Sequence, residues 1–210
     1  SIDPSGPPTF AGANAKATLT NGALQNALAS NDVTVDADPV GGGTGSGSIT
    51  VDAPITWVSG KSLTFLTNNN GLAQSNGELT INKAISGGGA LSFSNIGFNA
   101  NPEPGTININ AAVAATGGVT ILNGTTAAGT LNIGAGGSIT FAAAQSIKTI
   151  NNTGGIATFN GNVTFTTGGF SGGTTTFNGT ANSVTDLNLS NSATVTANGP
   201  LNVTGTAQLK

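Results

Sequence analysis

Residues 49–65 read ITVDAPITWVSGKSLTF and contain three triplets in which two apolar residues flank a polar one. The triplets are Ile49-Thr50-Val51, Ile55-Thr56-Trp57 and Leu63-Thr64-Phe65. Alternate side chains of a β-strand point to opposite faces, so each triplet would turn its apolar residues inward and its polar residue outward. In a helix, residues i and i+2 lie on nearly opposite sides, so the pattern predicts short strands instead.

The same triplet recurs along the rest of the chain. Later copies include Leu79-Thr80-Ile81, Leu91-Ser92-Phe93, Ile107-Asn108-Ile109, Val119-Thr120-Ile121, Leu131-Asn132-Ile133, Val163-Thr164-Phe165 and Leu201-Asn202-Val203. Internal repetition of this kind indicates a solenoid. Triplets follow one another about every 12 residues, and Phe141, Phe165 and Leu189 are each separated by 24 residues. We therefore expect two triplets per coil and a coil of about 24 residues.

The spacing predicts an all-β fold, a parallel right-handed β-helix of about seven or eight coils. Glycine steps such as Gly117-Gly118 and Asn123-Gly124 are expected at its corners, where they supply positive φ. An immunoglobulin-like or jelly-roll sandwich also has short strands at 8 to 12 residue spacing, but its strands are usually longer than three residues. The regular placement of aliphatic and Phe residues argues against a disordered chain.

Three regions are expected along the chain: a tail or linker over residues 1–13, an N-terminal cap over 14–47, and β-helix repeats over 48–210 that continue in a longer protein. The cap is predicted to contain a short helix over residues 21–30, with Asn21 as N-cap and Leu24 and Leu28 on its apolar face. A solenoid end needs such a cap because its strand edge otherwise pairs with other chains.

The composition limits the chemistry of this chain. Charged residues make up 6% of the 210 residues, against roughly 25% in an average domain. The net charge is −3 and every basic residue is Lys, so we expect no nucleic-acid partner. The absence of His and Cys removes the usual nucleophile pairs, and we expect no enzyme activity and no cofactor. The sequence contains no run of about 18 apolar residues, so we expect no membrane span.

Three acidic residues cluster beside a Gly-rich loop: Asp32, Asp36 and Asp38. Turns favour Asp for backbone reasons, which explains the cluster without a ligand. The alternatives are a loop contact with a partner or a weak Ca²⁺ site built from oxygen ligands. Trp57 ends an inward-alternating triplet, so we expect it in the core or the cap rather than stacked on a sugar.

Six Asn-x-Ser/Thr sequons are candidate glycosylation sites, although an Asn-rich and Thr-rich chain produces many by chance. They are Asn123, Asn151, Asn162, Asn178, Asn188 and Asn202. Of these, Asn162, Asn188 and Asn202 lie in or beside triplets whose middle residue faces outward, where a sugar would be tolerated.

The stretch from Leu24 to Phe65 resembles the filamentous-haemagglutinin-like exoproteins of Gram-negative bacteria, the large secreted adhesins of two-partner secretion. It keeps a short helix, the strand Val33-Thr34-Val35, a Gly-rich loop and the triplets of residues 49–65, in that order. Residues 71–210 are similar only as generic β-helical repeat. The secretion domain of the family carries Asn-Pro-Asn motifs, whereas this chain has Asn101-Pro102-Glu103. The chain therefore resembles a stalk or functional segment rather than the secretion signal.

The resemblance implies a secreted protein at the bacterial cell surface, with an outer-membrane secretion partner for the full-length protein. It further implies attachment to host or neighbouring cells through a glycan or protein on their surface. It also lends some support to the sequons, because the family contains glycosylated adhesins. We expect a monomer that binds through a β-helix face.

Three other functions stay open from the sequence. A polysaccharide-processing β-helix enzyme would need clustered carboxylates, and a structural stalk would bind nothing. Rows of outward Thr also permit ice binding, although the mixture of Asn, Ser and Thr argues against a flat lattice match. The Thr residues of those rows are Thr174, Thr176, Thr194 and Thr196.

Overall fold

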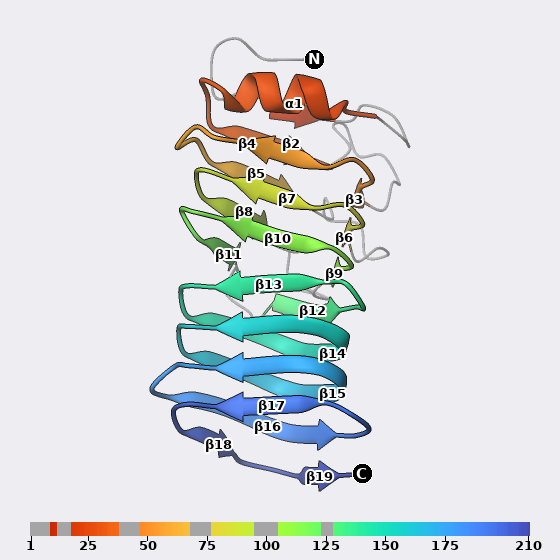
Figure 1. Ribbon diagram of the computed structural model, residues 1–210, viewed down its shortest axis with the longest axis vertical. Helices are drawn as coiled ribbons and strands as arrows, with labels where there is room; N and C mark the ends of the chain where they lie inside the picture. The colour runs from red at the N-terminus through yellow and green to blue at the C-terminus, as the bar shows by residue number, and fades with distance from the viewer. Residues whose placement is uncertain (1–8, 12–17, 38–46, 68–76, 95–104, 123–127) are drawn as a thin grey trace, which may run out of the picture.

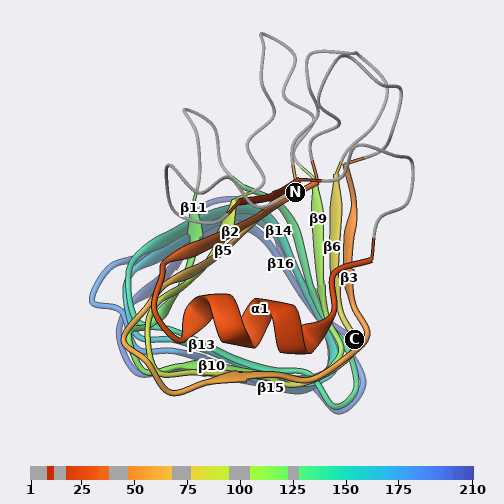
Figure 2. The same ribbon diagram turned by 90° about the horizontal axis from the view of Figure 1, so that it is seen from above.

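The computed structural model describes residues 9–11, 18–37, 47–67, 77–94, 105–122 and 128–210. Its strands join into one 19-stranded sheet in which every pairing is parallel, and the sheet winds into a solenoid (Figure 1). Seen along the axis, the coils enclose a three-sided section (Figure 2). The chain runs clockwise as it recedes from the N-terminal end in Figure 2, so the solenoid is right-handed. The predicted parallel β-helix is confirmed.

Three stacks of strands form the sides, which we name faces A, B and C. Face A contains β1 (Thr9–Ala11), β2 (Val33–Asp36), β5 (Leu63–Leu66), β8 (Leu91–Ser94), β11 (Val119–Leu122) and β18 (Leu201–Val203). Face B contains β3 (Ile49–Val51), β6 (Glu78–Ile81), β9 (Thr106–Ile109), β12 (Ala128–Ile133) and β19 (Ala207–Leu209). Face C contains β4 (Ile55–Trp57), β7 (Ile85–Gly87), β10 (Ala112–Ala115), β13 (Ser138–Phe141) and β17 (Thr194–Ala197). Three longer strands bend from one face to the next. The strands β14 (Gln145–Phe159) and β15 (Val163–Phe177) contribute to faces A, B and C, and β16 (Asn182–Leu189) contributes to faces A and B.

Each coil thus contains three strands, and the predicted coil of two triplets and 24 residues is wrong. Register partners on face A lie 30 residues apart at Val33 and Leu63, whereas Phe141 and Phe159 on face C are 18 apart. The 24-residue spacing of Phe141 and Phe165 joins two different faces. Eight strands of the described chain stack on face B and seven on face C, which agrees with the predicted seven or eight coils.

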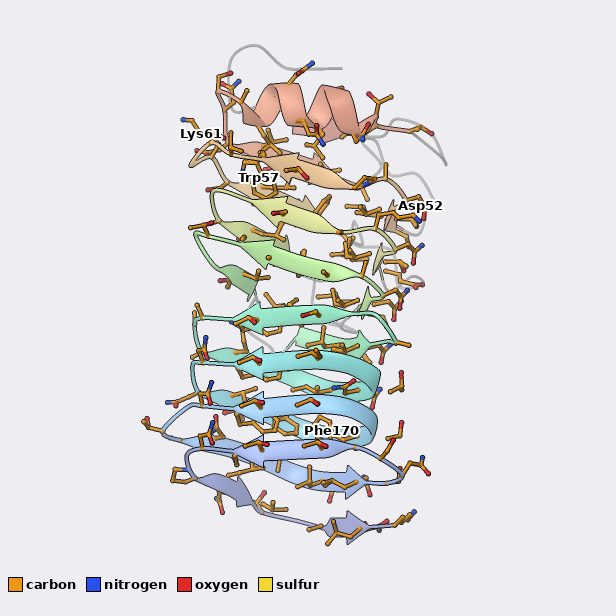
Figure 3. The ribbon with its side chains drawn as sticks, in the orientation of Figure 1. Asp52, Trp57, Lys61 and Phe170 are labelled. Atoms are coloured by element: carbon orange, nitrogen blue, oxygen red, sulfur yellow. The ribbon has the colours of Figure 1, made fainter. Side chains whose placement is uncertain are left out.

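The core fills the space inside the coils with the inward residues of each strand. Burial alternates along the strands, as in β4, where Ile55 and Trp57 are buried and Thr56 is exposed. The rings of Phe141, Phe159 and Phe177 stack through successive coils, with centroids 5.1 and 5.4 Å apart. Each such fully buried side chain contributes about 1.5–3 kcal/mol of apolar transfer free energy. Trp57 is a core residue, as predicted, and its Nε1–H donates to the Lys61 carbonyl at 2.7 Å (Figure 3).

The N-terminal end is covered by α1 (Asn21–Leu28), which lies across the first coil (Figures 1 and 2). Leu24 and Leu28 are buried against the coil below, as predicted. The helix ends two residues before the predicted Ser30. Its N-cap is Thr20 rather than Asn21: the Thr20 hydroxyl accepts from the Ala23 N–H at 3.3 Å. The side chain of Asn21 instead donates to the Pro54 carbonyl at 3.4 Å, tying the helix to the coil.

The corners use glycine for two reasons rather than the one predicted. Gly118 and Gly136 have positive φ, as expected for turns that an L side chain rarely adopts. At Gly161 the reason is close packing, because a Cβ there would lie 2.4 Å from the backbone of Ala143 and Ala144 in the neighbouring coil. Of the predicted tail, residues 9–11 form β1 and pair with β2. Most of the predicted Gly-rich loop lies outside the described residues.

Candidate functional site: two interrupted asparagine ladders

The outward middle residues of face B form a hydrogen-bonded row, which we name the face-B ladder. The Nδ2 group of Asn108 donates to Thr80 Oγ1 at 3.3 Å and to Glu78 Oε1 at 2.5 Å. Asn132 Nδ2 donates to Asn108 Oδ1 at 2.8 Å, and Asn151 Nδ2 donates to Asn132 Oδ1 at 3.0 Å. Asn108 and Asn132 therefore each accept from the coil below and donate to the coil above.

A second row, the corner ladder, consists of the residues that follow the face-B strands. Asn82 Nδ2 donates to Asp52 Oδ1 at 2.9 Å, and Asn110 Nδ2 donates to Asn82 Oδ1 at 3.0 Å. Asp52 begins this row at the edge of the molecule (Figure 3). A third ladder follows the face-C strands near the C-terminal end and contains Asn160, Asn178 and Asn198, joined by bonds of 2.8 and 2.7 Å.

Glycine interrupts both the face-B ladder and the corner ladder. Gly169 is the register partner of Asn151, and a Cβ at Gly169 would lie 2.6 Å from Asn151 Oδ1. Gly134 occupies the position after Asn110 in the corner row, and its Cβ would lie 2.7 Å from Asn110 Oδ1. Both carbonyl oxygens thus extend into space that a side chain would fill. Neither oxygen accepts a hydrogen bond from the described residues.

The two interruptions open into one hollow with a volume of about 460 Å³, which we name the ladder hollow. Its lining is Asn110, Asn132, Gly134, Asn151, Thr153, Gly169, Phe170, Ser171, Asn188 and Ser190. The register places these residues on five successive coils. At about 4.8 Å per coil, the hollow extends over about 19 Å along the solenoid axis. None of the lining residues carries a charge.

The far side of the ladder hollow presents further polar groups without partners. Asn188 follows Gly169 in the face-B row, and its amide makes no hydrogen bond to the described residues. The hydroxyls of Ser171 and Ser190 in the corner row likewise make no hydrogen bond to the described residues. Phe170 is buried in the core at 1% exposure, so its ring is not offered to a ligand (Figure 3). The hollow can therefore form hydrogen bonds but has no aromatic platform.

The predicted sequons differ in the state of their amides. Asn151 and Asn178 donate through Nδ2 to the preceding ladder residue, whereas the side chains of Asn188 and Asn202 bond to none of the described residues. Asn162 uses only its Oδ1, which accepts from the Ala181 N–H at 3.0 Å. A glycan is attached through Nδ2, so the structure favours Asn162, Asn188 and Asn202 over the two ladder residues. Asn123 lies outside the described residues.

The predicted acidic cluster is spread along a strand. Asp32 precedes β2, and its Oδ1 accepts from the Ser62 N–H at 2.7 Å in the next coil. Asp36 ends β2, about 13 Å further along the strand by the usual rise per residue. Asp38 lies outside the described residues. The part of the chain that the structure describes contains no group of three or more His, Cys, Asp and Glu residues able to hold a metal ion.

The other acidic side chains in the described residues form hydrogen bonds between neighbouring coils. Asp52 and Glu78 are members of the two ladders, and Asp186 Oδ1 accepts from the Thr206 N–H at 3.0 Å. No helix within the described ranges is long and apolar enough to cross a membrane. No protein-family model matches this chain, and neither does any curated protein or any solved structure.

Proposed function

We propose that this chain is a non-catalytic attachment module of a secreted bacterial surface protein, which binds a glycan or protein on a host or neighbouring cell. The observation that carries this proposal is the ladder hollow, an uncharged hollow whose lining includes amide and hydroxyl groups that bond to none of the described residues. The Asn110 and Asn151 side chains are held by the hydrogen bonds of their Nδ2 groups, so their carbonyl oxygens can accept from a ligand without first being reorganised. The resemblance of residues 24–65 to two-partner-secretion adhesins supports the cell-surface location.

The architecture supports a rigid presentation of that face. Each coil of face B bonds to the next through both backbone and side chains. Hydrogen bonds between neighbouring amides hold the side chains of the face-B ladder from Asn108 to Asn151 in one geometry. The carboxylates of Asp32 and Asp186 accept from backbone N–H groups and that of Asp52 accepts from a ladder amide, which is not the arrangement of a paired acid and base.

An attachment assay tests the proposal. The 210-residue chain is coupled to fluorescent beads, which are presented to epithelial cells and to Gram-negative bacterial cells, with albumin-coated beads as the control. We expect saturable attachment that soluble chain competes away, and no release of reducing sugar ends from added polysaccharides. Attachment equal to that of albumin beads would favour a passive stalk, and release of sugar ends would favour the enzyme.

A further inference from the structure

The glycine interruption of the face-B ladder leaves an acceptor and a donor on opposite sides of a missing side chain. On face B, the row runs Asn132, Asn151, Gly169, Asn188, with an amide on each side of the gap. Asn151 Oδ1 extends into the gap and has no donor among the described residues. Asn188 lies on the other side, and its amide bonds to none of the described residues. Two coils, or about 9.6 Å, separate the Cα positions of these two residues.

We propose that the ladder hollow binds a neutral oligosaccharide, whose hydroxyl groups replace the missing rungs at Gly169 and Gly134. This inference rests on the proposed attachment function and names its site and ligand class. Sugar hydroxyls both donate and accept, so one hydroxyl can donate to Asn151 Oδ1 while an adjacent hydroxyl accepts from Asn188 Nδ2. A further hydroxyl can donate to Asn110 Oδ1 above Gly134.

Charge selects a neutral ligand over an acidic one. The lining offers no Lys or Arg to pair with a carboxylate, sulfate or phosphate. Transferring an unpaired charge into such a site costs more than transferring a hydroxyl that finds hydrogen bonds. The nearest charged residues along the strands are Asp186, two residues before Asn188, and Lys148, three residues before Asn151, and neither is part of the lining. An acidic sugar would therefore bind less well than a neutral one.

Shape selects a chain over a compact ligand. The gaps at Gly134 and Gly169 lie two coils apart along the axis and in two different rows, so the hollow runs obliquely along the face. An extended chain of several pyranose rings can present hydroxyls to both gaps at once. The ring of Phe170 is buried, so binding depends on hydrogen bonds and is weak.

Gly169→Asn tests the site because it restores the missing rung. The backbone at Gly169 does not have a positive φ, and the nearest atom to a new Cβ is Asn151 Oδ1, the movable end of a side chain. The new amide would continue the face-B ladder towards Asn188 and fill the hollow. Thr140→Asn is the matched control, since Thr140 is exposed on face C and receives the same side chain away from the hollow.

The measurement is a titration of the ¹⁵N-labelled 210-residue chain, followed by NMR. The probes are cellohexaose, laminarihexaose and mannohexaose, with a galacturonic acid hexamer as the acidic comparison. We expect saturable shifts of side-chain amide signals with at least one neutral probe and weaker binding of the acidic one. Gly169→Asn should weaken binding at least about tenfold, and Thr140→Asn should leave it within about twofold.

Asn188→Ala keeps the proposal falsifiable if Gly169→Asn does not fold. The Asn188 side chain has no partner among the described residues, so its removal leaves the fold intact and should weaken binding about fivefold. Unchanged binding by a folded variant, binding of the acidic probe alone, or binding of no probe would overturn the inference. In the bead assay, attachment that persists in Gly169→Asn would overturn the hollow as the attachment site while the proposed function stands.

Discussion

Asn152 shows how a single amide replaces an apolar residue inside the coil. It occupies the inward face-B position that Ile133 fills in the coil before and Phe170 in the coil after. Although its side chain is polar, it is fully buried. Its Nδ2 donates to the carbonyls of Gly155 and Thr174, both at 3.1 Å, and to Thr175 Oγ1 at 3.0 Å. Its Oδ1 accepts from the Gly154 and Gly155 N–H groups. The side chain thus satisfies the backbone at the bend between faces B and C.

Replacing Asn152 by Ala should lower the free energy of unfolding by about 2–4 kcal/mol, because several buried backbone groups lose their partner at once. Urea unfolding followed by circular dichroism measures the change. Asn202→Ala, at an exposed position with no side-chain hydrogen bond to described residues, should change it by less than about 0.5 kcal/mol. Equal effects of the two substitutions would show that the amide of Asn152 is not a structural group.

At the scale of the element, α1 closes the end of the solenoid with two leucines. Leu28 is fully buried and Leu24 is 3% exposed, while the opposite side of the helix faces solvent. The Leu28 carbonyl also accepts a hydrogen bond from the Ser59 hydroxyl in the coil below. Without this cover, the edge of the first coil would present unpaired strand groups to other chains.

Leu28→Ala should destabilise the chain by about 2–5 kcal/mol through the cavity it leaves and should promote self-association as the cap loosens. Urea unfolding and light scattering after size-exclusion chromatography measure the two effects. Asn26→Ala, on the exposed side of the same helix, is the control and should behave like the parent chain. A Leu28→Ala chain as stable as the parent would contradict a stabilising role for the helix.

The elements were predictable where the sequence marks both inward positions with large apolar residues. That was so for β4, β5 and the apolar face of α1. The face-C strand β7 was not predictable, because a small residue fills one of its two inward positions. This residue, Gly87, lies in register with Trp57, and a Cβ there would be 2.1 Å from the indole ring. The indole ring of Trp57 in the preceding coil therefore determines that only glycine fits at position 87.

The ladder hollow was equally hidden from sequence reasoning. Asn108 and Asn132 were recognisable as outward residues of triplets, but Gly168-Gly169-Phe170 is not an apolar-polar-apolar triplet. Its membership of the face-B row follows only from the register with β14. Because coil length changes along the chain, no fixed period aligns Gly169 with Asn151.

At the scale of the whole molecule, the hollow begins where the coils shorten. Register partners on face B lie 24 residues apart at Ile107 and Leu131, and 18 apart at Ile150 and Gly168. In the shorter coils, β14 and β15 pass from face A to face B as continuous strands. In these coils no loop separates face A from face B, which favours the proposed binding of an extended ligand.

A crystal structure of the 210-residue chain with the neutral hexasaccharide that binds most tightly tests the central claim most directly. We predict sugar density over face B with two adjacent hydroxyl oxygens in the gap at Gly169, one within hydrogen-bond distance of Asn151 Oδ1 and the other within hydrogen-bond distance of Asn188 Nδ2. Density for the sugar on another face, with the gap at Gly169 free of it, would contradict the account.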